Sequence, residues 1–409
     1  MNSVQSHLID FLSFSIQGKK TSAKNISKKD LHWLIKEVKA HNIQGLVYCG
    51  IDNIQYLESI DKELIDSCRK DVFVGGILQI QHINQLKKVF LEFNNNRIPV
   101  IALKGIFLRN FYPRPEQRTM CDADILVHKE DLQRVRELLT RLGYTESEDS
   151  TPAHISFQHE RYLPIEVHWS LFDSRYFRTA SMLQDEVWQR AEIKQIDEVQ
   201  VLSLCPEDFL LHLCVHMAIH MRSSGFGLRQ LCDVTQFIRA ARWSIDWPHF
   251  QKIIKESNIE RFCLSILKAC EKLFHLDLPS ELDFCDKIDK KYINILISDI
   301  FSSGVHGNRS MYQTFGNTLL NSNVVFGEKS PVKINSILKI IFPPANVLSH
   351  SYSYAKKCKP LLPVAWVHHL LAGIFNKRYS IIDKLSFLLL SDLTFKRRLK
   401  LIKALDLQK

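Results

Sequence analysis

The sequence predicts an α+β protein in which a small β-sheet core lies between a helical N-terminal region and a helical C-terminal bundle. Apolar residues recur three and four positions apart across residues 27–94 and again after Pro206, which is the spacing of amphipathic helices. Between these regions, residues 96–172 contain short β-rich runs. The chain has 409 residues, 45% hydrophobic and 24% charged, so it is long enough for more than one packed domain.

The N-terminal region carries the helical spacing in two runs, residues 31–38 and 78–90. The pattern changes at residues 98–103, which are short and rich in β-branched side chains. Lys104-Gly105 and a helical stretch over 106–112 come next. This order predicts a strand, a glycine turn and a helix.

The run Asp122–Val127 alternates between polar and apolar residues at its start, so a strand there places Asp122 and Asp124 on one face. A helix is predicted over residues 129–142, with Gly143 at the position that ends it. Two further strands fit residues 154–159 and 163–169. Residues 96–172 are therefore predicted to form the part of the chain that contains the sheet.

Beyond Pro206 the helical spacing predicts a bundle packed beside this unit. Residues 302–330 are rich in Gly, Ser and Asn and are predicted to form a loop, and a last helical region ends in a basic run over 396–403. No internal repeat is visible. The predicted divisions are a helical region (1–95), a catalytic core (96–205), a helical bundle (206–300), a loop-rich segment (301–333) and a helical basic C-terminal region (334–409).

The net charge is +10 and the pI is about 9.0, which favours an anionic partner for the basic surface. The ten cysteines form no Cys-x-x-Cys pair, so neither a zinc finger nor a thioredoxin-like motif is present, and reduced thiols are expected. The N-terminus does not resemble a secretory signal, and the apolar stretch 361–375 is too short and polar to span a bilayer. We expect a cytoplasmic protein with no integral membrane segment.

Two carboxylates on one strand face can hold divalent ions, and a pair of ions can act on the attacking and leaving oxygens of a phosphoryl displacement. Asp122 and Asp124 have this arrangement. Upstream, Lys104-Gly105 precedes a helix, where backbone N–H groups and the lysine favour a triphosphate. Downstream, Glu166 and His168 share one face of a predicted strand, which adds a third carboxylate.

The runs LKGIFLRNFYPRPEQRTMCDADILV, IEVHWSLF and LHLCVHMAIH, followed by GLRQLCDV and DW, resemble the uncharacterised nucleotidyltransferases of the DNA polymerase beta-like superfamily, which are bacterial proteins. The resemblance covers about residues 98–250. It implies a small mixed sheet with flanking helices. It also implies an enzyme that transfers a nucleoside monophosphate from an NTP, ATP included, to an acceptor. The implied cofactor is Mg²⁺, as two ions, with Mn²⁺ as an alternative.

The resemblance assigns a role to each matching position. Asp122, Asp124 and Glu166 are the implied catalytic and metal-binding residues, with Glu166 orienting or deprotonating the acceptor hydroxyl. Lys104, Gly105 and Arg118 are implied to bind the triphosphate. The family usually has Gly-Gly or Gly-Ser where this chain has Gly105-Ile106, so one phosphate contact is missing.

His212, His216 and His220 recur every fourth residue, so they lie along one helix face. Three readings stay open for them, which are a zinc site, a lining for the nucleotide or acceptor cleft, and plain packing. Among these three histidines, His216 is the predicted nucleotide-binding residue. Arg229 is either a ligand of the triphosphate from the bundle side or the partner of Asp233 in an intrahelical ion pair.

The sequence therefore predicts a Mg²⁺-dependent nucleotidyltransferase whose substrates are an NTP and an unknown hydroxyl-bearing acceptor. A sugar or glycan intermediate, a natural product, a protein and an RNA all remain open as acceptors. The competing hypothesis is a non-catalytic protein of the same fold that recruits an anionic partner or a membrane surface. The oligomeric state is not predicted.

Overall fold

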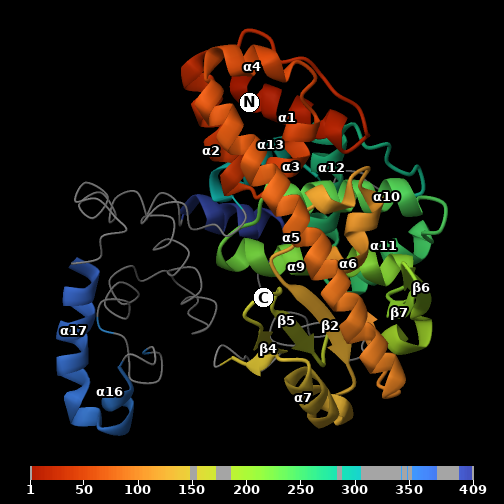
Figure 1. The fold of residues 1–409 in the computed structure, drawn as a ribbon, viewed down its shortest axis with the longest axis vertical. Coiled ribbons are helices and arrows are strands. Elements are labelled where there is room, and N and C mark those ends of the chain that lie inside the picture. The colour runs from red at the N-terminus through yellow and green to blue at the C-terminus, as the bar shows by residue number, and fades with distance from the viewer. Residues whose placement is uncertain are drawn as a thin grey trace.

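The computed structural model describes residues 2–147, 154–171, 186–282, 288–304, 342, 348, 352–374 and 396–407 (Figure 1). The N-terminal helices are α1 (Ser3–Ser15), α2 (Lys28–Ala40), α3 (Gln44–Cys49), α4 (Ile54–Ile60) and α5 (Lys62–Asn95). The strands are β1 (Val100–Ala102), β2 (Ala123–Val127), β3 (Thr145–Glu146), β4 (His154–Gln158), β5 (Ile165–His168), β6 (Glu192–Ile196) and β7 (Val199–Ser203). The later helices are α6 (Gly105–Leu108), α7 (Leu132–Arg141), α9 (Pro206–Ser223), α10 (Leu228–Ala241), α11 (Trp247–Glu256), α12 (Glu260–Phe274), α13 (Lys290–Ser303), α16 (Ser353–Lys357) and α17 (Leu362–Ile374).

The strands form one seven-stranded sheet in the order β3-β4-β5-β2-β1-β7-β6. β2 runs antiparallel to β1 and parallel to β5, so the sheet is mixed. All five residues of β2 are buried, because the strand lies in the middle of the sheet. The predicted α+β class, with helical regions on both sides of the sheet in the sequence, is confirmed.

The β6–β7 hairpin was not among the predicted strands, and it extends the sheet at the β1 edge. β7 pairs with β1 in parallel through Ile101 and Leu202. The turn between β6 and β7 is tight, and Asp197 adopts a positive φ of 52° there. Val199, Val201 and Ser203 of β7 are buried and alternate with less buried residues, as expected where one face of a strand meets the core.

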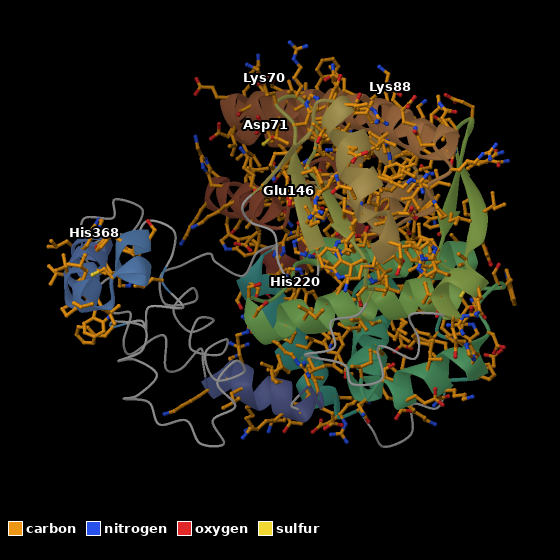
Figure 2. The ribbon with its side chains drawn as sticks, turned by 90° about the horizontal axis from the view of Figure 1, so that it is seen from below. Lys70, Asp71, Lys88, Glu146, His220 and His368 are labelled. Atoms are coloured by element: carbon orange, nitrogen blue, oxygen red, sulfur yellow. The ribbon has the colours of Figure 1, made fainter. Side chains whose placement is uncertain are left out.

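The 34-residue helix α5 runs from the N-terminal helices to the sheet (Figure 1). Asp61 caps its first turn by accepting a hydrogen bond from the backbone of Leu64. Lys70 and Lys88 are on its exposed surface (Figure 2). On its buried face, Gln79 exchanges two hydrogen bonds with the backbone of Met120, at 2.9 and 3.2 Å. The helix therefore holds the segment that leads into β2.

Helices α9, α10, α11 and α12 pack together, and their buried residues belong to the same hydrophobic core as the sheet. Pro206 begins α9, where the missing N–H of proline leaves no hydrogen bond unmade. α9 is buried over most of its length, because the sheet lies on one side and α11 and α12 lie on the other (Figure 1). This position brings the α9 side chains to the sheet.

Most of the predicted loop-rich segment lies outside the described residues; its first residues, 301–303, end helix α13. α16 and α17 pack in a small separate cluster with Leu348 and Tyr352. Residues 396–404 are helical and pack on the main core through Leu401 and Ile402. None of the helices in the described ranges has the length and hydropathy needed to cross a bilayer.

The basic run near the C-terminus is only partly a solvated face. Arg398 is 3% exposed, and its guanidinium lies 3.7 Å from the Asp299 carboxylate and donates to the Met221 carbonyl. Lys396, Arg397 and Lys400 are exposed. Arg398 therefore fastens the C-terminal helix to the bundle instead of offering charge to a partner.

Candidate active site

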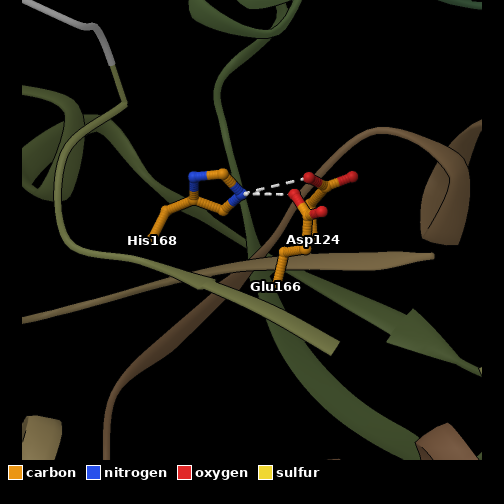
Figure 3. A group of neighbouring side chains, drawn as sticks. All are labelled: Asp124, Glu166 and His168. Carbon is orange, nitrogen blue, oxygen red and sulfur yellow. Dashed lines mark hydrogen bonds and ion pairs between the residues drawn. The ribbon is translucent and has the colours of Figure 1, made fainter. Parts of the chain in front are cut away.

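The centre of the site is a pair of carboxylates on neighbouring parallel strands. Asp124 of β2 and Glu166 of β5 are directly paired in the strand register, so their side chains leave the same face of the sheet. His168 follows two residues after Glu166 on that face. Its Nε2 lies 3.1 Å from Asp124 Oδ1 and 3.6 Å from Glu166 Oε2 (Figure 3).

Lys104 neutralises part of this acidic group. Its Nζ donates to Asp124 Oδ1 at 2.8 Å, and the preceding residue, Leu103, donates its backbone N–H to the Asp124 carbonyl. Lys104 has a positive φ of 44°, an unusual backbone conformation for a residue with a side chain. Burial lowers the pKa of Lys104, but Asp124 and Asp122 outweigh it, so its pKa is raised and the ammonium stays charged.

The helix after the Lys104-Gly105 turn is shorter than predicted. α6 spans Gly105–Leu108, and a 3₁₀ turn over Arg109–Phe111 replaces the rest of the expected helix. A single helical turn has a small dipole, so the expected contribution of a helix N-terminus to phosphate binding is weak here. Lys104 itself is the main positive charge that this turn presents.

The two aspartates have different environments. Asp122 precedes β2 and has an exposed side chain, yet removal of water by the surrounding protein and the charge of Asp124 together raise its pKa to about 6. Asp124 is 4% exposed; burial opposes its ionised form, but Lys104 and His168 hold its pKa well below the usual range. Asp124 is therefore ionised at neutral pH.

A cavity of about 490 Å³ opens over these groups, a volume typical of small-molecule sites. One wall comes from the sheet and the turn before α6, and the other comes from α9 and α10. Every predicted site residue lines this one cavity: Lys104, Gly105, Arg118, Asp122, Asp124, Glu166, His216 and Arg229. His212 and His220, whose role the sequence left open, line it as well. The tertiary structure thus brings together residues that are more than a hundred positions apart.

The guanidinium of Arg118 is bound by another side chain of the protein. Its Nε and Nη2 donate to the two carboxylate oxygens of Asp233 at 3.0 and 2.6 Å, and Tyr112 donates its hydroxyl to the same carboxylate at 2.8 Å. Arg118 and Asp233 are each about 6% exposed at the side chain. This buried network joins the segment before β2 to helix α10.

The alternative of an Arg229–Asp233 ion pair is wrong, because Asp233 is paired with Arg118. Arg229 instead donates from Nη1 to the carbonyl of Thr119 at 2.8 Å. Among the described residues its buried Nε has no partner, and the residue lines the cavity. Arg229 is thus better placed than Arg118 to contact a bound anion.

Gly105 allows a close approach between the turn and Arg118. A Cβ at this position would overlap Arg118 Nη1 and lie 3.1 Å from the side chain of Met120. Two hydrogen bonds to Asp233 hold the guanidinium in this position, so moving it aside would break them. The glycine therefore serves packing of the Arg118 network, in addition to any role towards a phosphate.

The three α9 histidines all reach the cavity. The ring nitrogens of His212 have no partner in the described part of the chain, and burial lowers its pKa to about 3. His216 and His220 lie with their Nε2 atoms 3.1 Å apart, and burial lowers the pKa of His216 well below its usual value. These two imidazoles share a hydrogen bond, and no third ligand for zinc joins them within the described ranges.

Sequence reasoning missed His154. Its position on β4 pairs with His168 on β5, and the ring centroids lie 5.1 Å apart. Its Nε2 is 4.0 Å from Glu166 Oε2. The predicted strand over residues 154–159 did include His154. Its neighbour across the sheet depends on the register of the antiparallel strand pair, and the spacing of residues within one strand does not determine that register.

The chemistry of the donor set fits a divalent metal ion. Asp124, Glu166 and His168 offer ligand atoms that all lie within 4.8 Å of one another, and they are the one such group in the part of the chain that the structure describes. Two carboxylate oxygens and an imidazole nitrogen are common metal ligands. Asp122 lies outside this close group and at the edge of the same cavity.

A sheet that presents paired acids to a cavity beside a lysine-bearing turn agrees with the resemblance seen in the sequence. The chain belongs to the family described as "Uncharacterised nucleotidyltransferase", whose profile matches residues 27–275. The resemblance seen in the motifs is thereby confirmed. No curated protein matches the sequence.

Two solved structures are similar to parts of the chain. The lincosamide antibiotic adenylyltransferase LnuA, bound to lincomycin, is 15% identical with a TM-score of 0.27 and covers 38% of this chain and 94% of its own. An antigenic nucleotidyltransferase-like protein from Paracoccidioides brasiliensis is 14% identical with a TM-score of 0.29 and covers 48% and 97%. These values are too low to transfer a substrate or a residue role.

Proposed function

We propose that the protein is a Mg²⁺-dependent nucleotidyltransferase that moves a nucleoside monophosphate from an NTP to a hydroxyl group of an acceptor. The observation that supports this most directly is the pairing of Asp124 and Glu166 in register on adjacent strands at the floor of a 490 Å³ cavity. This arrangement occurs in a chain of a nucleotidyltransferase family.

In the proposed reaction the acceptor oxygen forms a bond to the α-phosphorus of the NTP. The bond from that phosphorus to the oxygen bridging the β-phosphate breaks, and pyrophosphate leaves with the electron pair. The proton of the acceptor hydroxyl passes to the carboxylate of Glu166. Hydrogen bonding from His168 lowers the pKa of Glu166, so its carboxylate is ionised and ready to accept this proton.

Divalent ions held by Asp122, Asp124 and Glu166 would supply positive charge to the phosphate oxygens. Lys104 is proposed to add charge from the turn at the cavity edge, with its ammonium moving between Asp124 and a phosphate oxygen. Arg229 is proposed to contribute from the opposite wall, since it lines the cavity and its buried Nε has no partner among the described residues. Arg118 and Gly105 shape the turn that carries Lys104.

His216 and its neighbours on α9 are proposed to contact the nucleotide. The imidazoles of His212 and His216 are neutral, because burial lowers their pKa values. Neutral imidazoles donate or accept hydrogen bonds without adding charge. They suit a base or sugar better than a phosphate.

We keep the predicted divisions of the chain as part of this proposal, with residues 96–205 as the catalytic unit and 206–300 as the bundle that closes the cavity. The walls of the cavity come from these two ranges. We also propose a cytoplasmic location, where NTPs are available. The nine cysteines in the described residues are all free, which suits a reducing compartment.

The test is label transfer from α-³²P-labelled NTPs, offered one at a time with Mg²⁺ to a cell extract separated into protein, RNA, glycan and small-molecule fractions. We expect wild type to label one fraction and Asp124→Asn to label none. Asp277→Asn, a matched change at a residue that is 87% exposed, should behave as wild type. If no NTP gives label and none raises the melting temperature, the reaction is refuted and the non-catalytic binding protein becomes the better hypothesis.

A further inference from the structure

The nitrogen of His168 is placed where a metal ligand would lie. Its Nε2 is 3.1 Å from Asp124 Oδ1 and 3.6 Å from Glu166 Oε2, and both oxygens belong to the carboxylates that would bind the ion (Figure 3). In an octahedral site with bonds of about 2.1 Å, neighbouring donor atoms lie about 3.0 Å apart. The distances between this nitrogen and the two oxygens are thus close to those between ligands on one face of a metal ion.

The strands hold the three side chains in this arrangement. Asp124 and Glu166 are paired across β2 and β5, and His168 is two residues further along β5 on the same face. The side chain of His168 is 18% exposed and that of Asp124 is 4% exposed. Because all three side chains are carried by hydrogen-bonded strands of one sheet, the backbone positions of the donors are set before any ion arrives.

We propose that His168 is a direct ligand of the catalytic metal and that this nitrogen makes the site prefer a first-row transition ion, with Mn²⁺ as the ion to test, over Mg²⁺. Mg²⁺ favours oxygen ligands and gives up its water reluctantly, whereas imidazole nitrogen binds transition ions well. A site with one nitrogen and two oxygens therefore shifts the balance between the two metals. The inference rests on the proposed function, since it concerns the metal of the same reaction.

The alternative role for His168 is structural. In that role its ring would only hydrogen-bond Asp124 and hold the carboxylate in place, and the metal would contact oxygen atoms alone. The two roles differ in whether nitrogen is bonded to the ion. They also differ in the effect of His168 on the choice of metal.

The experiment is pulsed EPR of Mn²⁺ bound to the purified protein without nucleotide, together with calorimetric titration of Mn²⁺ and Mg²⁺. We expect nitrogen coupling of a directly bonded imidazole in wild type. It should vanish in His168→Gln and persist in His154→Gln, which changes a histidine of similar exposure 4.0 Å from Glu166. Wild type should favour Mn²⁺ by about tenfold or more, and His168→Gln should reduce this ratio several-fold through weaker Mn²⁺ binding.

The wild-type spectrum decides the question even if a variant fails to fold. Mn²⁺ bound without nitrogen coupling would overturn the inference and leave the proposed function intact. Loss of the coupling in His154→Gln alone, or an unchanged metal ratio in a folded His168→Gln, would also overturn it. If neither ion binds the wild type, the metal has to be removed from the proposed function as well.

Discussion

The buried pair of Arg118 and Asp233 offers the clearest test of how the site is held together. Changing Arg118 to Met removes the guanidinium and leaves the Asp233 carboxylate, which is 6% exposed, with the hydrogen bond from Tyr112 as its one remaining side-chain partner among the described residues. Removing one partner of a buried ion pair leaves an uncompensated charge and costs about 3–5 kcal/mol. We expect Arg118→Met to lower the free energy of unfolding by this amount.

The assay is urea denaturation followed by circular dichroism. The double variant Arg118→Met/Asp233→Leu should be less destabilised than the sum of the single variants by about 2 kcal/mol or more, because it removes the stranded carboxylate. The control is Lys39→Met, which breaks an exposed pair with Asp71 at 2.9 Å, where the side chains are 48% and 46% exposed. It should cost less than about 1 kcal/mol.

A loss below about 1 kcal/mol in Arg118→Met would refute the reasoning, because a buried carboxylate without its partner cannot be that easily tolerated. Additive effects in the double variant, within about 0.5 kcal/mol, would do the same. Either result would mean that Arg118 is accessible to solvent or ligand in solution. The original prediction that Arg118 binds the triphosphate would then be preferred.

Three further predictions follow from single positions in and around the cavity. Gly105→Ala should lower the free energy of unfolding, measured by urea denaturation, by about 1–3 kcal/mol, because the new Cβ overlaps Arg118. The control Gly75→Ala, which has open space around it in helix α5, should raise this free energy by about 0.5–1 kcal/mol. Equal effects of the two changes would contradict the packing argument. Burial lowers the pKa of His212 from about 6.5 in the unfolded chain to about 3 in the folded protein, so the unfolded state binds the proton first and the free energy of unfolding falls as the pH drops below about 6.5. Between neutral pH and about pH 4, His212→Gln should lose roughly 3 kcal/mol less of its free energy of unfolding than wild type does. Parallel pH profiles of unfolding for the two proteins would count against this prediction. Gln79→Leu should lower the free energy of unfolding by about 1–3 kcal/mol and reduce label transfer, since the N–H and the carbonyl of Met120, just before β2, lose their partner. An unchanged free energy of unfolding in the same assay would show that water takes the place of the Gln79 side chain.

Local patterns were enough to predict many elements near the site. The alternation at Asp122–Val127 predicted β2, and the helical run over 129–142 predicted α7, which the positive φ of 86° at Gly143 helps to end. These features depend on neighbours within a few residues. The β6–β7 hairpin was harder to predict, because most residues of β6 are exposed and so lack a continuous apolar pattern.

The partners of charged residues were harder to predict than the elements that carry them. The i, i+4 spacing of Arg229 and Asp233 permitted an ion pair along the helix, but Arg118 approaches Asp233 from another element and binds it with better geometry. The position of a long, flexible side chain depends on which elements pack against each other. Spacing within one helix carries no information about that packing.

The sequence by itself determined the class of the fold, the strand that carries Asp124 with Asp122 just before it, and the family resemblance that the profile over residues 27–275 confirms. Only the tertiary structure decided that His168 lies between Asp124 and Glu166, that Lys104 contacts Asp124, and that the α9 histidines face these acids across one cavity. The reason is physical. Periodicity reports which side of its own element a residue faces, whereas contacts across the cavity depend on strand register and helix packing, which involve residues far apart in the chain.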